Sequence, residues 1–324
     1  MRNEGMHLLE WVAYHRAIGF DRVVVATNDC DDGTDLMLDR LAGLDAVIHI
    51  RNPVPPGEKP QVMALRRALP HPAMAQVEWL LHCDADEFLN VTAGGGRVDD
   101  LLAAVGECDA ISVLWRHFGS SGMTRWQKGS VIERLTLTER RPHYPMHKSL
   151  FRPDRFAAAA LHMPKSPHSR DVVLKNAAGR ILNPATLFDP GHNRHQDLVP
   201  GDLTWENAVI NHYATCSEDI FLMKNHRGDG MALQTKKYYR NSRHWRRCNR
   251  NEVEDRSILR HLPALRERLA GYLADPLLAE LDAAAFDWFV RRRDAILTEE
   301  QVRLWTHPRA LPAPALQDQT EVPT

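Results

Sequence analysis

The sequence predicts an α/β fold, with a doubly wound and mainly parallel sheet followed by a C-terminal helical region. Over residues 8–115, short runs of β-branched and apolar residues alternate with helical patterns. Polar clusters follow two of these runs, where strands are expected to end. Amphipathic helical patterns dominate from Glu252 to about Trp305. Strands and helices that alternate in this way indicate βαβ units, whose ligands bind beyond the carboxyl ends of the strands.

The predicted elements of the first half follow one another in a regular order. Apolar residues at helical spacing predict a first helix over 8–18, which Gly19 ends. The predicted strands are the β-branched or apolar runs at 22–26, 46–50, 79–83 and 110–115. The other predicted helices lie between these strands, at 34–41 with Thr34 as its cap, at 61–69 and from Asp99 onward.

The pattern becomes less regular after Gly122. Shorter strand-like runs at 131–137 and 149–151 are separated by loops rich in proline and histidine. Ser217 is the predicted N-cap of a further helix, because two acidic residues follow it in the first turn. The Pro- and Ala-rich end, 308–324, is predicted to be disordered.

Composition and charge exclude several classes of function. The 324 residues include 41 Lys and Arg against 42 Asp and Glu, so no overall field attracts a nucleic acid. The five cysteines form no Cys-x-x-Cys pair, which argues against a zinc ribbon or a disulfide framework and favours a reducing cytoplasm. No apolar stretch approaches the roughly 20 residues that cross a bilayer, and the start has no signal-peptide core. We therefore expect a cytoplasmic protein without a transmembrane segment.

The strongest local signal is the acidic triplet Asp84-Ala85-Asp86, which follows the predicted strand 79–83. Two carboxylates one residue apart at a strand end can reach one hard cation, and the alanine between them takes little space. We therefore expect Asp84 and Asp86 to bind Mn²⁺ or Mg²⁺. The alternative is a solvated acidic turn, because Asp-x-Asp also occurs often by chance.

A second polar cluster, 28–34, follows the predicted strand 22–26. Its amide and carboxylate side chains can hydrogen-bond the base or the ribose hydroxyls of a nucleotide, and Asn28 and Asp31 are the better candidates for such contacts. The alternative is a turn followed by a helix cap, in which Asp32 binds backbone amides.

Several short motifs occur in a fixed order along residues 2–230. They are Arg2-Asn3-Glu4-Gly5, Leu9 to His15, Gly19-Phe20, Asn28 to Thr34, His82 to Phe88, Trp115 to Gly122, His147-Lys148-Ser149 and Asn211-His212-Tyr213. Each motif alone is weak, but the ordered set resembles family-2-like glycosyltransferases and the related group that includes plant galactan synthases.

The resemblance implies a GT-A fold, with a Rossmann-like nucleotide-binding half. It implies transfer of a sugar from a nucleotide donor, usually a UDP-sugar, with inversion at the anomeric carbon. By this resemblance Asp84 and the catalytic Asp86 belong to the metal-diphosphate site, and His212 is a third metal ligand or a diphosphate contact. The residues implied to line the nucleoside pocket are Asn3, Glu4, Asn28 and Asp31.

The same resemblance suggests a division of the chain. A glycosyltransferase domain is expected over 1–230, with a nucleotide-sugar half at about 1–122 and an acceptor side at about 123–230. The helical C-terminal region is expected over 231–307, followed by the disordered tail, 308–324.

Charged residues elsewhere are candidates for catalysis. Lys148 and Lys224 can neutralise the donor diphosphate, since an ammonium stabilises a departing phosphate; the alternative is ordinary solvated charge. An inverting transfer also needs a general base near the acceptor hydroxyl. Glu133 is our candidate for this base, although it can instead pair with a nearby arginine. The remaining candidates are Asp202, Glu206 and Asp219.

Two further segments are candidates for acceptor contacts. Trp115, His117 and Phe118 can stack on a sugar ring or belong to the core. The basic stretch 236–250 interleaves aromatic residues with charge, so it can meet an anionic acceptor or a membrane surface. The alternative for this stretch is a solvated basic segment.

These observations together predict a metal-dependent glycosyltransferase, cytoplasmic or peripheral at the inner membrane, that acts on a glycan, lipid-linked or small-molecule acceptor. A sugar-nucleotide nucleotidyltransferase is an alternative, although no Gly-rich phosphate loop is present. A catalytically silent nucleotide-sugar-binding protein is another. In the resembling group an apolar strand precedes the Arg-Asn-Glu motif, whereas only Met1 does so here, and we expect a β-rich extension upstream.

Overall fold

The computed structural model describes residues 1–142, 144–228 and 237–306. Helices alternate with strands through much of the first half, so the predicted α/β class is confirmed. The predicted disordered tail, 308–324, lies outside the described residues. Within the described ranges, no helix is both long and apolar enough to cross a membrane.

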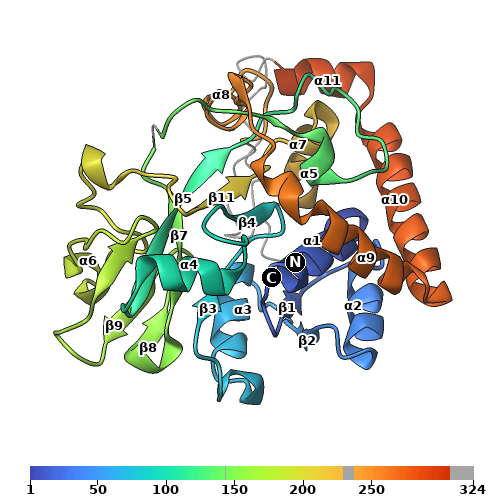
Figure 1. The fold of residues 1–324 in the computed structure, drawn as a ribbon. Coiled ribbons are helices and arrows are strands. Elements are labelled where there is room, and N and C mark those ends of the chain that lie inside the picture. Colours follow the sequence, from blue (N-terminus) through green and yellow to red (C-terminus); the bar gives the residue numbers. More distant parts are fainter. Residues whose placement is uncertain (143, 229–236, 307–324) are drawn as a thin grey trace, which may run out of the picture.

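The larger sheet lies at the centre of the molecule and is mixed (Figure 1). In spatial order its strands are β3 (Leu80–Leu81), β7 (His147–Phe151), β5 (Ala110–His117), β11 (Ala208–His212) and β4 (Glu87–Val91), with β10 (Leu174–Asn176) also paired to β5. β5 runs parallel to β11 and β10, whereas the β3/β7, β5/β7 and β11/β4 pairs are antiparallel. The prediction of a mainly parallel sheet is therefore wrong, because apolar runs identify strands but carry no information about their direction.

A separate two-stranded sheet joins β1 (Val24–Thr27) and β2 (Ile48–Arg51) in parallel. Helix α2 (Thr34–Gly43) connects the two strands and packs on them, which is the predicted βαβ unit. Helix α3 (Pro60–Ala68) follows and contacts β1.

The turn before α2 uses Asp32, not Thr34, as its capping group. Gly33 occupies the N-cap position with a φ of +87°, and Thr34 is the first helical residue. The Asp32 carboxylate accepts hydrogen bonds from the backbone N–H of Thr34 at 2.8 Å and from that of Gly5 at 2.9 Å. Asp32 therefore also fixes the start of α1 beside the end of β1.

Helix α1 (Gly5–Ala17) is buried along most of its length between the larger sheet and the C-terminal helices. Helices α9 (Leu262–Leu273) and α10 (Pro276–Ile296) pack against it on one side of the molecule (Figure 1). On the sheet side, Trp11 Nε1 donates to the Glu87 carbonyl at 2.9 Å and Tyr14 Oη donates to the Leu89 carbonyl at 2.8 Å. These bonds fix the position of β4 and of the loop that precedes it.

Residues 131–137, predicted to be strand-like, begin as a helical turn, α5 (Val131–Arg134). The Ser130 side chain accepts a hydrogen bond from the Glu133 N–H, and the Glu10 carboxylate accepts from Val131 N–H at 2.8 Å. The apolar run therefore forms a turn because a residue from α1 binds its free amides.

The remaining elements complete the fold and include the predicted helix after Ser217, which is α7. The helices are α4 (Val98–Val105), α6 (Ala185–Phe188), α7 (Glu218–Arg227), α8 (Arg243–Cys248) and α11 (Glu299–Thr306). The strands are β6 (Leu137–Thr138), β8 (Phe156–Ala159), β9 (Pro164–Pro167) and β12 (Val253–Glu254).

Candidate active site

The acidic triplet forms the loop between β3 and β4, and its backbone is held from two sides. Trp11 Nε1 donates to the Asp84 carbonyl at 3.2 Å, and the Tyr213 N–H donates to the Asp86 carbonyl at 2.8 Å. The side chains of Asp84 and Asp86 are 28% and 27% exposed. The loop is thus rigid, while both carboxylates reach the surface.

Asp84 is held by a buried lysine. Lys148 Nζ donates to Asp84 Oδ2 at 2.9 Å, and Gln61 Nε2 donates to the other carboxylate oxygen at 2.9 Å. The Lys148 side chain, from β7, is only 1% exposed. Burial by itself would raise the pKa of Asp84, but the Lys148 ammonium outweighs it and lowers that pKa. Asp84 is therefore ionised at neutral pH.

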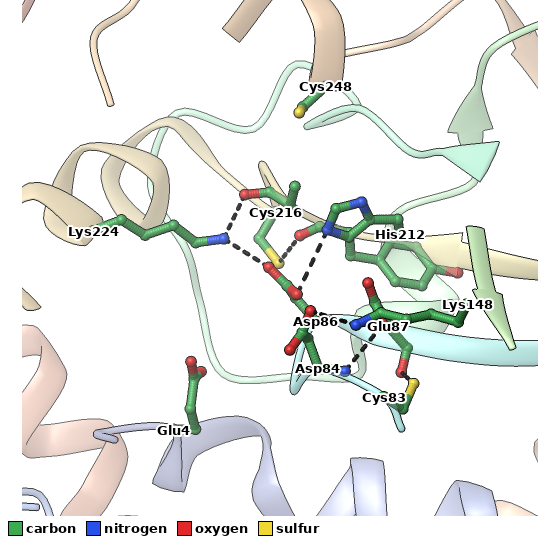
Figure 2. A network of polar contacts seen from close by, with 12 residues as sticks. Glu4, Cys83, Asp84, Asp86, Glu87, Lys148, His212, Cys216, Lys224 and Cys248 are labelled. Carbon is green, nitrogen blue, oxygen red and sulfur yellow. Dashed lines mark hydrogen bonds and ion pairs between the residues drawn. The ribbon is translucent and has the colours of Figure 1, made fainter. Parts of the chain in front are cut away.

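Asp86 meets a second lysine and a histidine (Figure 2). Lys224 Nζ, from α7, donates to Asp86 Oδ2 at 2.8 Å and to the Ala214 carbonyl at 2.7 Å. His212 Nε2, at the end of β11, lies 3.6 Å from Asp86 Oδ1. Burial would raise the pKa of Asp86, but Lys224 and His212 hold it well below its usual range. Figure 2 shows Lys224 and Lys148 reaching the loop from opposite sides.

Glu87, directly after the triplet, is a site residue that the sequence did not single out. Its carboxylate is fully buried, with Oε2 accepting from the Asp84 N–H at 3.0 Å and lying 3.4 Å from Lys148 Nζ. Burial raises the pKa of Glu87, against the opposing effect of Lys148. A glutamate that directly follows Asp-x-Asp at a strand start was the only available signal, and burial could not be read from it.

The residues expected to line a nucleoside pocket fall into two groups. Asn3 and Glu4 line a cavity of about 60 Å³, together with Asp86 and Lys224, whereas Asn28 and Asp31 are not among its lining residues. Glu4 forms an ion pair with Arg227 of α7.

Asn28 and Asp31 still lie close to this region. Asn3 Oδ1 accepts from the Asp31 N–H at 3.0 Å, and the Asn3 amide donates back to the Asp31 carboxylate. The Asn28 amide donates to Asp29 at 3.0 Å. The turn after β1 and the start of α1 thus form one polar surface.

Glu133 is not brought to the acidic loop. It lies on α5, where its carboxylate pairs with Arg266 of α9 at 2.8 Å, and it does not line the cavity beside Asp86. Among the alternatives, Asp219 is buried and pairs with Arg293 at 3.1 Å, and Asp202 lies 3.8 Å from Arg180.

Asp86 and His212 are the pair best placed to hold a cation. Across the described ranges, no group of three or more His, Cys, Asp and Glu side chains is arranged around a common metal position. The 3.6 Å between His212 Nε2 and Asp86 Oδ1 is long for a hydrogen bond. Two ligands that each lie about 2.1 Å from one cation are roughly 3.0–3.6 Å apart at angles of about 90–120°. The two side chains therefore fit a divalent ion whose other ligands come from elsewhere.

Two aromatic rings pack near His212. The Trp115 ring centroid lies 4.2 Å from that of His212, and the His117 ring lies 5.2 Å from it. Trp115 and His117 are buried, with 8% and 2% exposure. Phe118 is fully buried and belongs to the core.

Comparison with known proteins gives one family. A family model described as glycosyltransferase family 92 matches residues 3–256. Two plant proteins with that family name, from Ricinus communis and Oryza sativa subsp. japonica, are 28% identical over 178 residues and 27% identical over 174 residues. Each alignment covers 53% of this chain but only 31% and 29% of the respective relative. The chain spans about a third of the length of these curated relatives.

Proposed function

The chain belongs to glycosyltransferase family 92, and from this premise we propose that it transfers a sugar from a nucleotide-sugar, of the UDP type, to an acceptor hydroxyl. The observation that carries the proposal is the acidic loop, where Asp86 meets both Lys224 and His212 beside a cavity that Asn3 and Glu4 also line. The narrower resemblance to family-2-like enzymes and galactan synthases, with its GT-A fold, stays a prediction.

The donor diphosphate is proposed to bind at Asp86. Lys224 offers an ammonium beside this carboxylate, and its side chain is 10% exposed, so it can approach a phosphate oxygen. Lys148 is too buried to do the same, and we propose that it acts by holding Asp84 in its ionised form. Lys224 would then contact the ligand, whereas Lys148 would stabilise the acidic loop.

We propose that Asp86 and His212 hold Mn²⁺ or Mg²⁺, with Asp84 as an outer ligand. A bound divalent ion would neutralise charge on the departing diphosphate as a Lewis acid. Asp86 Oδ2 is already bonded to Lys224, so Oδ1 is the oxygen that faces His212 and the proposed ion. His212 keeps its Nδ1 without a hydrogen-bond partner among the described residues, and the Trp115 ring supports the imidazole from the side.

Inversion requires a general base, and Glu133 remains our proposal for it with one condition. Its carboxylate pairs with Arg266 and does not line the cavity beside Asp86. The acceptor would therefore have to reach α5. Replacing Glu133 with glutamine tests the role, because a base is lost while the shape of the side chain is kept.

The acceptor is proposed to be a glycan, a lipid-linked sugar or a small molecule, and the buried Trp115 and His117 rings do not stack on it. Part of the predicted basic stretch, including Lys236, lies outside the described residues. Arg247 of α8 is close enough for its charge, after burial and His212, to lower the pKa of His117. The positive charge of Arg247 near His117 supports a peripheral contact with anionic groups. We also propose that the protein acts in the cytoplasm.

A panel of UDP-, GDP- and CMP-sugars with Mn²⁺ tests the proposal against its alternatives. We expect donor turnover that a chelator abolishes and that Mn²⁺ or Mg²⁺ restores. Binding of nucleotide-sugar without turnover would favour a catalytically silent binding protein. This alternative is specific because Lys148 and Lys224 already pair with Asp84 and Asp86, the carboxylates proposed to act at the metal site. Formation of nucleoside triphosphate from the donor and pyrophosphate would overturn the transferase assignment.

A further inference from the structure

Two histidines lie at the edge of the larger sheet where the acidic loop begins. His82 directly follows β3, and its Nδ1 donates to the Leu161 carbonyl at 2.9 Å. His162 lies between β8 and β9, and its Nδ1 donates to the His147 carbonyl, at the start of β7, at 3.0 Å. A carbonyl oxygen only accepts hydrogen bonds, so Nδ1 carries the proton of each neutral ring and Nε2 keeps a lone pair.

Both of these lone pairs are accessible. The two rings are half-buried, and neither Nε2 atom has a hydrogen-bond partner among the described residues. They differ in this from the ring nitrogens of His117, which lack a partner and are fully enclosed. The Nε2 atoms of His82 and His162 are therefore open to solvent, and a ligand can reach them.

The charges around the two rings place them beside Asp84. Burial, followed by the Lys148 ammonium, lowers the pKa of His82 and of His162 to about 4, against the opposing effect of the Asp84 carboxylate. Charges act on a pKa at short range, so both rings lie near Asp84 and Lys148. At physiological pH both rings are neutral, with the lone pair on Nε2.

A ring contact connects this group to the other end of the acidic loop. The Trp115 ring centroid lies 5.5 Å from that of His162 and 4.2 Å from that of His212, which approaches Asp86. Asp84 and Asp86 are two positions apart, so their Cα atoms are at most about 7 Å apart. A sugar bonded directly to a diphosphate at Asp86 is therefore within reach of the surface beside Asp84.

The exposed polar atoms of this surface are hydrogen-bond acceptors. The Asp84 carboxylate is 28% exposed, and each of its oxygens accepts one bond within the protein and can accept another. The closest cation, Lys148, is only 1% exposed. Phosphate oxygens are acceptors too and would be repelled here, whereas a sugar hydroxyl can donate to an imidazole or a carboxylate. Because no three His, Cys, Asp and Glu side chains of the described ranges share a metal position, a hydroxyl is the group that matches.

We propose that His82, His162 and Asp84 form a subsite that binds hydroxyl groups of the donor sugar, on the side of the acidic loop opposite Lys224. The inference rests on the proposed function, because the sugar is attached to the diphosphate that would bind at Asp86. Lys148 and Lys224 reach the loop from opposite sides (Figure 2). The donor then lies across the loop, with its charge toward Lys224 and its sugar toward the imidazoles.

Calorimetry with UDP-glucose, UDP-galactose and UDP in the presence of Mn²⁺ tests this subsite. The two hexoses present their 4-hydroxyl in opposite orientations, and the measured quantity is the affinity for each UDP-sugar divided by that for UDP. His162→Phe keeps a ring without the lone pair, so it should lower this ratio about three- to tenfold for at least one sugar and leave the affinity for UDP unchanged. His162→Gln, whose amide oxygen can accept in place of Nε2, should keep most of the ratio.

A matched control is His168→Phe. His168 directly follows β9, on the same hairpin as His162, and is exposed. This change should leave the ratio as in the wild type. Melting temperatures identify a folding defect in His162→Phe, in which case His82→Phe carries the same test with the same expected fall.

Two different results would separate the possible failures. An unchanged ratio for both sugars in folded His162→Phe, or an equal fall in His168→Phe, would overturn the subsite while leaving the proposed function in place. Failure of the wild type to bind UDP itself would instead remove the proposed donor class and the premise of this inference with it.

Discussion

Lys148 stands between two carboxylates that would otherwise repel each other. It donates to Asp84 at 2.9 Å and lies 3.4 Å from Glu87, and its side chain is almost fully buried. A buried charge that loses its partner is costly because neither water nor another charge replaces the contact. Lys148 is therefore a structural requirement of the acidic loop.

Replacing Lys148 with methionine should destabilise the protein by about 3–5 kcal/mol, since the fully buried Glu87 carboxylate and the partly exposed Asp84 carboxylate lose their common counter-charge. The double variant with Glu87→Gln should recover part of this loss. Urea unfolding of the single and double variants measures both effects.

Lys128→Met is the control for that series. Lys128 pairs with Asp282, but its side chain is 51% exposed, so its loss should cost less than about 1 kcal/mol. Equal destabilisation by the Lys128 and Lys148 substitutions would contradict the role given to Lys148.

At the scale of elements, α5 shows how a distant residue decides local structure. The run 131–137 reads as strand-like, yet the Glu10 carboxylate accepts from the Ser130 hydroxyl and from the N–H groups of Val131 and Ile132. Glu10 is more than 100 positions away in the sequence, with separations of 120 to 122 residues. No local pattern contains that information, so the strand prediction failed there.

Glu10→Gln should destabilise the protein by about 1–3 kcal/mol, because an amide has one acceptor oxygen where the carboxylate has two. The backbone amides of 131–134 should also exchange with solvent faster. Hydrogen exchange measured by mass spectrometry reports both the site and the size of the effect.

Glu133→Gln is the matched variant on the same turn. Its carboxylate is 32% exposed and pairs with an exposed arginine, so this change should leave stability nearly as it was. If Glu10→Gln also left the exchange of 131–134 unchanged, the capping role of Glu10 would be wrong.

The regular elements were easier to predict than their directions. The β-branched run before the turn at 28–33 and the apolar spacing of α1 were read correctly, because both patterns are local. The antiparallel pairing of β7 with β5 and of β4 with β11 was not predicted, because it depends on contacts between segments far apart in the chain.

Across the whole molecule, buried neutral histidines make stability depend on pH. Burial is the first cause that lowers the pKa of nine described histidines, which are His7, His15, His82, His117, His147, His162, His195, His244 and His261. For His7, His15 and His195 the folded pKa is about 4, against an ordinary 6.5. At a pH between about 4 and 6.5, the unfolded chain therefore binds more protons than the folded chain.

Stability should therefore be complete above about pH 6.5 and should fall as the pH decreases toward 4. Each such histidine contributes up to about 3 kcal/mol to the loss. The raised pKa values of Glu10 and Glu87 act in the opposite direction, but the histidines outnumber them. Urea unfolding at pH 7.5, 6 and 5 measures the slope, and a stability that rises on acidification would contradict this account.

The candidate site was partly predictable because its residues lie in recognisable motifs. Asp84, Asp86, Lys148, Lys224 and His212 were each proposed from the sequence. Their pairing was not, since Lys148 is 64 positions from Asp84 and Lys224 is 138 positions from Asp86.

The most direct measurement is Mn²⁺-dependent UDP-sugar turnover by the wild type and by Asp86→Asn. Asp154→Asn, whose side chain is 61% exposed, is the control for loss of an acidic group. With the fold intact by circular dichroism, Asp86→Asn should lower turnover by about 10²–10³-fold and weaken its dependence on Mn²⁺, while Asp154→Asn stays at the wild-type rate. Turnover by Asp86→Asn at the wild-type rate would contradict the placement of the donor diphosphate at Asp86.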